Sequence, residues 1–185
     1  MRVISGIRRG KKLFEFEGED IRPTTDRVKE AIFNLIQGRW ENAVVFDAFS
    51  GTGSLGIEAL SRGARYAVFT DIDKRSYDLI KQNVQGCDFQ DKCEVVNTSA
   101  CSYLEKTDKQ FDLLFVDPPY NKGLVTPLLE VVLRRKLVSP EGSIVIERDG
   151  YEDAFDASGY QVEKERKYGR TVITVLKMQQ KEGVD

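Results

Sequence analysis

The sequence predicts an α/β fold in which helices cover both faces of a mostly parallel sheet. From residue 43 onward, short apolar segments of strand length alternate with segments whose apolar residues recur at helical spacing. This order is typical of parallel sheets, because a helix connects each strand to the next one. The chain has 185 residues, which suits a single domain with a sizeable core.

Each element follows from its local pattern of apolar residues. The expected strands cover residues 43–47, 65–71, 93–97, 111–117, 143–147 and 171–178. The expected helices lie near residues 54–62, 74–85, 99–106 and 122–136. Because these elements alternate along the chain, residues 41–180 are predicted to form one doubly wound domain.

The first 40 residues form an extension that precedes this domain. Short apolar runs at residues 3–5 and 13–16 flank a basic turn, and this pattern predicts a β-hairpin. A helix is expected to begin near Asp26, because the preceding threonine can cap it and an acidic residue suits its positive end.

The C-terminal part of the chain departs from the alternation. Residues 160–165 and 171–178 flank a basic segment, which predicts an antiparallel hairpin with residues 166–170 in its turn. The basic side chains of that turn are Arg166, Lys167 and Arg170. A solvated surface loop is favoured for them over a contact with nucleic acid. Residues 181–185 are expected to be a disordered tail.

Composition excludes several classes of function. The chain has no histidine, so it lacks the commonest metal ligand and the usual general base, and its three cysteines show no CxxC spacing. We therefore expect no metal site. No apolar run is long enough to span a membrane, and the N-terminus has no apolar core of a secretory signal. The protein is expected to be cytoplasmic, without a membrane partner, and monomeric.

A glycine-rich turn follows the first strand of the main domain. Gly51, Gly53 and Gly56 match the GxGxxG pattern, which by itself indicates a nucleotide-type cofactor only weakly. Asp47 ends the strand before the turn, where a carboxylate disfavours a pyrophosphate but suits a ligand that carries an ammonium and a sulfonium. Asp71 ends the next strand, where a carboxylate can accept hydrogen bonds from ribose hydroxyls. Nicotinamide cofactors and S-adenosylmethionine both need that ribose contact.

The tetrapeptide Asp117-Pro118-Pro119-Tyr120 follows the strand of residues 111–117 and carries the strongest functional signal. Two prolines cannot continue an interior strand, and they hold the backbone carbonyls in fixed directions. The Asp117 carboxylate and the Pro118 carbonyl can accept the two hydrogens of an amino group on a base. The amine lone pair is then available to attack a methyl sulfonium, while Tyr120 stacks on the base. Positioning supplies much of such a rate, so no strong base is required.

The motifs FDAFSGTG and DPPY resemble those of class I, Rossmann-like methyltransferases that act on amino nitrogens. Together with RVISGIRRGKKL, RPTTDRVKEAIFNLI and IEALSRGA, they resemble the RsmD family of 16S rRNA guanine-N2 methyltransferases. The resemblance implies a seven-stranded sheet whose antiparallel last strand is inserted beside the fifth. It also implies S-adenosylmethionine as cofactor, and the target amine at residues 117–120.

The resemblance assigns cofactor contacts to positions spread over four loops. These positions are Asp47, Phe49, Ser50, Gly51, Thr52, Gly53, Asp71, Ile72, Ser99, Ala100 and Asp117. Two of them depart from the family's usual pattern. Asp71 stands where glutamate is frequent, so the ribose contact must reach further. Ser99 stands where asparagine or aspartate is frequent, which changes the expected contact with the adenine ring.

RNA is the expected substrate, either as 16S rRNA or as the assembling small ribosomal subunit. A chain of 185 residues leaves little room for the target-recognition region of a DNA methyltransferase, and a protein glutamine methyltransferase usually reads NPPY. The N-terminal extension is basic, so phosphate contacts are expected there. The positions predicted to meet RNA are Arg8, Arg9, Lys11, Lys12 and Arg22.

Three other interpretations stay open. The motifs also occur in DNA and protein amino-group methyltransferases. A nicotinamide-dependent oxidoreductase would use GxGxxG but would leave DPPY without a role. A non-catalytic RNA-binding protein could keep the fold without turnover. The sequence leaves open which guanine is modified, and whether naked rRNA or the assembled subunit is the substrate.

Overall fold

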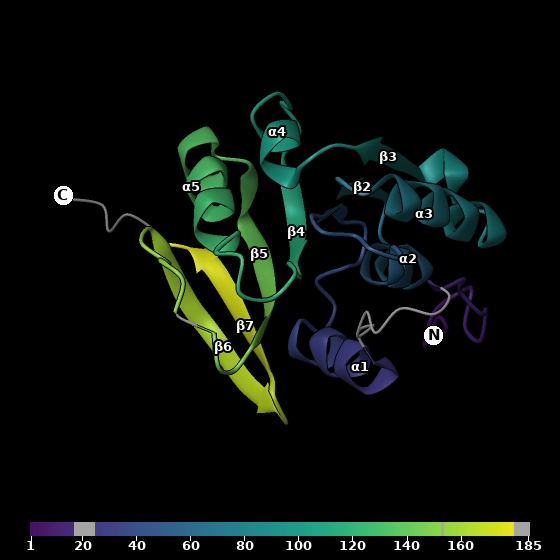
Figure 1. Cartoon of the computed structure of the whole chain (residues 1–185), viewed down its shortest axis with the longest axis horizontal. Coiled ribbons are helices and arrows are strands. Elements are labelled where there is room, and N and C mark those ends of the chain that lie inside the picture. The colour runs from purple at the N-terminus through teal and green to yellow at the C-terminus, as the bar shows by residue number, and fades with distance from the viewer. Residues whose placement is uncertain (17–24, 153, 180–185) are drawn as a thin grey trace.

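The computed structural model describes residues 1–16, 25–152 and 154–179. These residues contain one seven-stranded sheet with the order β3-β2-β1-β4-β5-β7-β6 (Figure 1). Its strands are β1 (Val44–Asp47), β2 (Tyr66–Asp71), β3 (Cys93–Asn97), β4 (Phe111–Val116), β5 (Val138–Asp149), β6 (Tyr160–Tyr168) and β7 (Thr171–Met178). β1 to β5 pair in parallel, and β7 lies antiparallel between β5 and β6. The predicted fold class is confirmed, including the antiparallel last strand beside the fifth.

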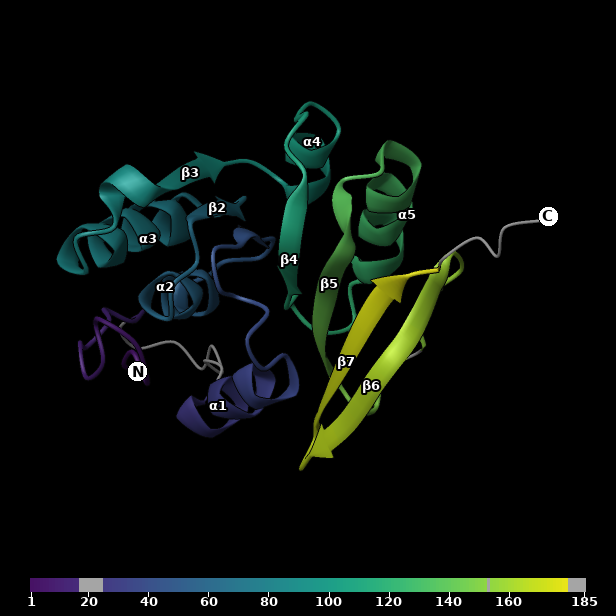
Figure 2. The same cartoon turned by 180° about the vertical axis from the view of Figure 1, so that it is seen from behind.

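Helices cover both faces of the sheet, as the alternation predicted. They are α1 (Asp26–Leu35), α2 (Ser54–Ser61), α3 (Lys74–Gly86), α4 (Ala100–Leu104) and α5 (Val125–Arg135), with a 3-10 turn at Gln90–Lys92. Figure 1 and Figure 2 show α1, α2 and α3 on one side of the strands and α4 and α5 on the other. Within the described residues, no helix is long and apolar enough to cross a membrane.

Successive residues of the central strands face opposite sides of the sheet. In β1, Val45 belongs to the core under α1 to α3, whereas Phe46 belongs to the core under α4 and α5. β4 repeats this division with Phe115 and Leu114. Because both faces of these strands are buried, they read as continuous apolar runs in the sequence. Polar groups are therefore confined to the ends of the strands.

The N-terminal extension packs onto the first of these two cores through Val3 and Leu13. The predicted hairpin is present as one antiparallel bridge between Arg2 and Lys12 and backbone hydrogen bonds that join its two arms, although residues 3–5 and 13–16 do not form regular strands. Some of their backbone N–H groups have other partners. Ile4 donates to the carboxylate of Glu58, and Phe14 donates to the side-chain oxygen of Asn83. Contacts with α2 and α3 thus add to the hydrogen bonds within the hairpin.

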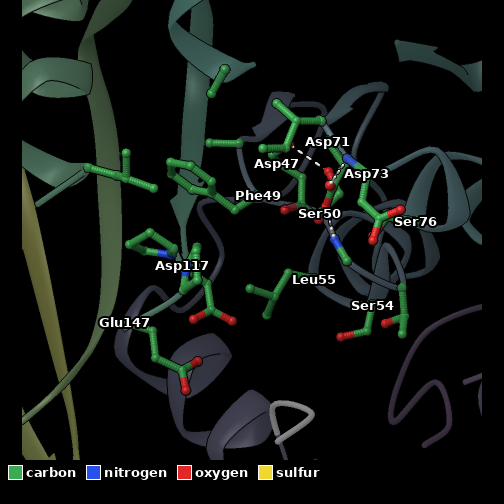
Figure 3. Close-up of a pocket in the computed structure, with 18 of the residues that line it drawn as sticks. Asp47, Phe49, Ser50, Ser54, Leu55, Asp71, Asp73, Ser76, Asp117 and Glu147 are labelled. Atoms are coloured by element: carbon green, nitrogen blue, oxygen red, sulfur yellow. Dashed lines mark hydrogen bonds between the residues drawn. The ribbon is translucent and has the colours of Figure 1, made fainter. Parts of the chain in front are cut away.

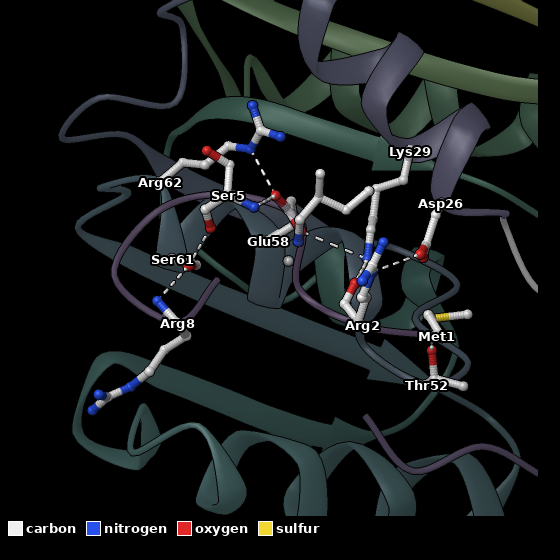
Figure 4. Close-up of polar contacts among 12 residues, drawn as sticks. Met1, Arg2, Ser5, Arg8, Asp26, Lys29, Thr52, Glu58, Ser61 and Arg62 are labelled. Carbon is white, nitrogen blue, oxygen red and sulfur yellow. Dashed lines mark hydrogen bonds and ion pairs between the residues drawn. The ribbon is translucent and has the colours of Figure 1, made fainter. Parts of the chain in front are cut away.

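Glu58 is the anchor of this extension (Figure 4). Its fully buried carboxylate accepts hydrogen bonds from the backbone of Ile4 at 2.8 Å and Ser5 at 3.0 Å, and from the Arg62 Nε at 2.8 Å. The Lys29 Nζ of α1 lies 3.6 Å from the same carboxylate and donates to the Arg2 carbonyl. Burial lowers the pKa of Lys29, against the opposing effect of Glu58. One acid on α2 therefore connects the extension and α1 to the sheet.

The C-terminal hairpin differs from the prediction in the length of its first strand. β6 continues to Tyr168, which pairs with Thr171, so the turn contains only Gly169 and Arg170. Gly169 has a φ of 62°, as the first position of such a two-residue turn requires. Placing Arg166 and Lys167 in the turn was therefore wrong. The predicted tail at residues 181–185 lies outside the described residues.

We expect Glu58→Ala to lower the free energy of unfolding by about 3–5 kcal/mol, because it leaves the buried Lys29 without its carboxylate partner and two backbone N–H groups without their acceptor. Urea denaturation measures this change. Asp78→Ala is the matched control, since it removes an exposed ion pair with Lys74 on α3 and should cost about 0.5 kcal/mol or less. Equal effects of the two variants would contradict the anchoring role of Glu58.

Candidate active site

A pocket of about 850 Å³ opens at the carboxyl edge of the parallel strands (Figure 3). Acidic residues at or just beyond the ends of β1, β2 and β4 line it, namely Asp47, Asp71 and Asp117. A fourth acid, Glu147, enters it from β5. Ligands of open α/β sheets bind at this edge, where the strand order reverses. Here the reversal falls between β1 and β4.

The glycine-rich turn forms the wall of the pocket between β1 and α2. Ser50 donates its backbone N–H to Thr70 of β2, and Gly53 begins α2 with a φ of 78°. Gly56 lets α2 lie directly on the sheet, because a Cβ at this position would come within 2.3 Å of the Phe69 ring. The third glycine of the pattern therefore serves helix–strand packing. Gly53 itself shapes the turn and is not among the residues that line the pocket.

Asp47 lies at the base of the pocket and is 2% exposed. Its Oδ2 accepts a hydrogen bond of 3.0 Å from the Gly56 N–H. Burial raises the pKa of Asp47 to about 7, and the charges of Asp117 and Asp71 add to that effect. The carboxyl group is thus held in a place where water cannot stabilise its charge. A cationic ligand group beside it would offset this cost.

Asp71 is held in place by two backbone donors. Its Oδ2 accepts from the Gly51 N–H and its Oδ1 from the Asp73 N–H, both at 2.9 Å. The side chain of Asn97 holds the adjoining backbone by donating to the carbonyls of Asp71 and Ile72. The Ile72 side chain lines the pocket and is 75% exposed, so it offers an apolar surface for a flat ring.

Asp73, two residues after Asp71, is a second carboxylate near the predicted ribose contact. It also lines the pocket, but its carboxylate caps α3 by accepting from the Arg75 N–H and pairs with the Arg75 side chain. Hydrogen bonds from Arg75 lower the pKa of Asp73. The Asp73 carboxylate is therefore already paired with a cation, whereas the Asp71 carboxylate accepts from backbone N–H groups.

Ser99 and Ala100 lie where the chain enters α4, and both line the pocket. The Ser99 hydroxyl accepts from the Ser102 N–H at 3.1 Å and lies 2.8 Å from the Ser102 hydroxyl. Because this hydroxyl caps the helix, part of its hydrogen-bonding capacity is already used within the protein. Ser99, which stands where the resembled family usually has an amide or an acid, thus also serves as the cap of α4.

The DPPY tetrapeptide lines the side of the pocket opposite Asp71. β4 ends its pairing with β5 at Val116 and Ile146, and residues 117–120 then turn across the pocket edge. Pro118 is buried, Pro119 is exposed, and Tyr120 is half-buried. Figure 3 shows the carboxylates of Asp117 and Glu147 pointing into the same part of the pocket. The tertiary structure thus brings the predicted cofactor-contact residues other than Gly53 and the predicted amine site into one cavity.

Glu147 is the main pocket residue that the sequence analysis missed. It is 5% exposed and lies on β5, which runs two residues further to Asp149. The rule that identified Asp47 and Asp71, an acid at the end of a buried parallel strand, also applies to it. Further lining residues without a distinctive sequence signal are Met1, Glu15, Phe16, Ser54, Leu55, Ser76, Thr98, Cys101 and Leu124.

Arg8 lies away from this pocket, although Met1, Glu15 and Phe16 of the same extension line it. Arg8 donates to the Cys87 carbonyl at 2.7 Å and pairs with Asp88 at 2.9 Å, just beyond the end of α3. α3 runs from the pocket edge of the sheet to the opposite edge, so Arg8 is at the far end of the domain. Arg9, Lys11 and Lys12 are exposed. Arg22 lies outside the described residues.

The electrostatic character of the pocket separates the candidate cofactors. Among its described lining residues, six are acidic and none is lysine or arginine. Such a lining repels the pyrophosphate of a nicotinamide dinucleotide and suits a ligand with positive groups. No group of three or more histidine, cysteine, aspartate or glutamate side chains that could hold a metal ion occurs among residues 1–16, 25–152 and 154–179.

Comparison with known proteins gives one family over nearly the whole chain. The family described as Conserved hypothetical protein 95 matches residues 1–177. The putative rRNA methyltransferase YlbH of Bacillus subtilis is 34% identical over 181 residues, which are 96% of this chain and 98% of that protein. The chain belongs to the RsmD family.

Other members resemble it similarly. The ribosomal RNA small subunit methyltransferase D of Haemophilus influenzae is 33% identical over 172 residues, which cover 91% of this chain and 89% of that protein. The structure of the putative methyltransferase yhhF from Escherichia coli matches with a TM-score of 0.86 and 29% identity, covering 97% and 98% of the two chains. RsmD-type proteins are rRNA methyltransferases with S-adenosylmethionine as cofactor, and that coarse assignment holds for this chain.

We expect Asp47→Asn to stabilise the ligand-free protein increasingly as pH rises. The folded-state pKa of about 7 exceeds the unfolded value near 3.8, so the wild type loses stability from this group as pH rises through 7. Asparagine has no proton to lose and can still accept from the Gly56 N–H. Between pH 5.5 and pH 8 the difference should grow by about 2 kcal/mol in denaturation experiments. A pH-independent difference would contradict the raised pKa.

Proposed function

We propose that the protein transfers a methyl group from S-adenosylmethionine to the exocyclic N2 amine of a guanine in 16S rRNA. The observation that carries this proposal is the position of Asp117 and its two prolines in the same pocket as Asp47 and Asp71. The pocket therefore has one part suited to a cationic nucleoside cofactor and an adjoining part suited to an amine. Family membership supports both assignments.

The cofactor part of the pocket fits S-adenosylmethionine in charge and in polar groups. The bound cofactor would supply an electrophilic methyl group, with S-adenosylhomocysteine as the leaving product. Asp47 lies where a carboxylate can stabilise the ammonium of the methionine part. Asp71 is oriented by Gly51 and Asp73 to accept from ribose hydroxyls, and Ile72 can pack on the adenine. The remaining cofactor contacts are assigned to Phe49, Ser50, Thr52, Gly53, Ser99, Ala100 and Asp117.

The amine part of the pocket acts by orientation. The Asp117 carboxylate and the Pro118 carbonyl accept the two N–H groups of the guanine amine, so the nitrogen lone pair is directed at the methyl group. Tyr120 stacks on the base and fixes its plane. The amine becomes acidic once its nitrogen is methylated, and water can take the released proton. This mechanism needs no imidazole, which is consistent with a chain that contains no histidine.

The first experiment is an assay with labelled S-adenosylmethionine and unmodified small-subunit rRNA or particles, followed by nucleoside analysis. Label in N2-methylguanosine is the expected result. Label in another nucleoside would refute guanine-N2 specificity while leaving an RNA methyltransferase. Cofactor binding without label in either RNA or particles would overturn the choice of RNA and direct the search to DNA and protein amines.

Particles are expected to be the better substrate, because the described basic residues of the extension are few and Arg8 lies at the opposite end of the domain from the pocket. Ribosomal proteins would then contribute to the target surface. Initial rates on protein-free rRNA and on small subunits at equal concentration measure this preference. Equal rates on the two substrates would refute it.

We expect Asp117→Ala to reduce the rate of methyl transfer by at least about a hundredfold, because a preorganised acceptor at the reacting nitrogen is lost. Asp117→Asn is the matched variant, since its amide oxygen keeps one acceptor in place, and it should lose less activity. Single-turnover rates measure the effect, and titration with S-adenosylmethionine serves as the control. Full turnover by Asp117→Ala would remove this residue from the mechanism.

A further inference from the structure

An exposed aromatic side chain with two cations beside it lies just after β5. Tyr151 is 79% exposed, the largest exposed fraction among the described large hydrophobic side chains. The Arg170 guanidinium lies 5.3 Å from the centre of its ring, and the Lys167 ammonium lies 5.9 Å from it. Both cations come from the end of the β6–β7 hairpin. Most of the tyrosine surface remains open to a further stacking partner.

A buried carboxylate holds this arrangement in place. Asp149, which is 4% exposed, accepts from the Tyr151 N–H through Oδ1 at 3.0 Å and from Arg170 through Oδ2 at 2.8 Å. The Gly150 N–H also donates to the Arg170 carbonyl at 2.6 Å. The loop after β5 and the turn of the hairpin are therefore connected through one residue. Tyr151 is preorganised at the surface, which reduces the entropy lost when a ligand binds.

The cluster borders the amine part of the pocket. β6 runs parallel to β5, so the β6–β7 turn lies at the same edge of the sheet as the pocket. Figure 2 shows this turn projecting beyond the end of β4. Glu152, the neighbour of Tyr151, accepts a hydrogen bond from the backbone N–H of Asn121, which directly follows the DPPY tetrapeptide. Lys122 is exposed in the same loop and adds positive charge.

The charge of this surface favours an anionic partner. Arg170 is partly neutralised by Asp149, whereas Lys167 makes no ion pair with another described residue. Arg166 is exposed and donates to the Glu165 carbonyl. Proteins bind single-stranded nucleic acid by combining exposed aromatic rings, on which bases stack, with nearby cations that contact the phosphates.

We infer that Tyr151, Lys167 and Arg170 form a stacking platform for one unpaired nucleotide that flanks the target guanine. The base of that nucleotide stacks on Tyr151, and its phosphates contact Lys167 and Arg170. The platform holds the RNA backbone while the target base enters the pocket beside Asp117. This inference rests on the proposed RNA substrate. It gives Lys167 and Arg170 a contact with RNA, whereas the sequence analysis favoured a solvated surface loop for them.

Tyr151→Ala tests the platform, with binding of unmodified small-subunit rRNA and of particles as the readout. Loss of one stacked base should weaken binding about fivefold to a hundredfold. Tyr151→Phe keeps the ring and should bind as the wild type does. The matched control is Tyr77→Ala on α3, where Lys74 and Lys81 lie 4.8 Å and 5.3 Å from the ring. This helix packs on β2 and β3, on the side of the sheet away from the β6–β7 hairpin. Unchanged binding by Tyr151→Ala, or an equal loss in Tyr77→Ala, would overturn the platform.

Lys167→Ala provides a second measurement. If Lys167 contacts a phosphate, its removal should reduce the slope of log affinity against log salt by about one. Tyr151→Ala and Lys167→Ala should both keep the wild-type affinity for S-adenosylmethionine, because neither side chain lines the pocket. Both should also keep the wild-type melting temperature, because both side chains are exposed. An unchanged salt slope would refute the phosphate contact.

The outcomes separate this inference from the proposed function. If wild-type protein makes N2-methylguanosine and Tyr151→Ala has the same KM for RNA, the proposed function stands and the platform is refuted. If Tyr151→Ala binds RNA more weakly but the wild type labels another nucleoside, the platform stands and the guanine-N2 assignment fails. A rise in KM with kcat unchanged is the expected kinetic result for Tyr151→Ala.

Discussion

Burial of the central strands on both faces is the constraint on which the rest of the structure depends. β1 and β4 place alternate residues in two separate apolar cores, so neither face can hold polar chemistry. The acidic side chains of the pocket are therefore placed at or just beyond the ends of these strands. Because parallel strands end at one edge, Asp47, Asp71 and Asp117 meet in a single pocket although 70 residues separate the first from the last.

The pocket carries an electrostatic cost in the absence of a ligand. Asp47 lies beside Asp71 and Asp117 in a place from which water is largely excluded, and its pKa rises to about 7 as a result. An acidic wall of this kind is poorly suited to phosphates and well suited to a sulfonium cofactor. Asp47 stays in this position because the Gly56 N–H donates to its carboxylate and the close packing of α2 on Phe69 holds the strand end in place.

Two basic regions lie at opposite edges of the sheet, and they have different structural roles. The N-terminal region uses Arg8 to hold the chain against the end of α3. The hairpin at the C-terminal end presents Lys167 and Arg170 around an exposed tyrosine beside the pocket. Glu58 and Asp149 are the corresponding buried anchors, since each carboxylate joins segments that are distant in sequence. The position of the N-terminal extension thus depends on Glu58, and the positions of Tyr151 and Arg170 depend on Asp149.

The sequence by itself determined the fold class, the order of strands and helices, and the DPPY and glycine-rich segments, because these depend on local periodicity and on backbone-restricting residues. The tertiary structure alone decided where the extension lies and which acids share the pocket. No local pattern shows that Ile4 bonds to Glu58, since that contact spans 54 residues. The β6–β7 register was likewise decided by backbone pairing, which places Arg166 and Lys167 in β6 and not in the predicted turn. Local signals report backbone preference, whereas long-range hydrogen bonds decide which preference is realised.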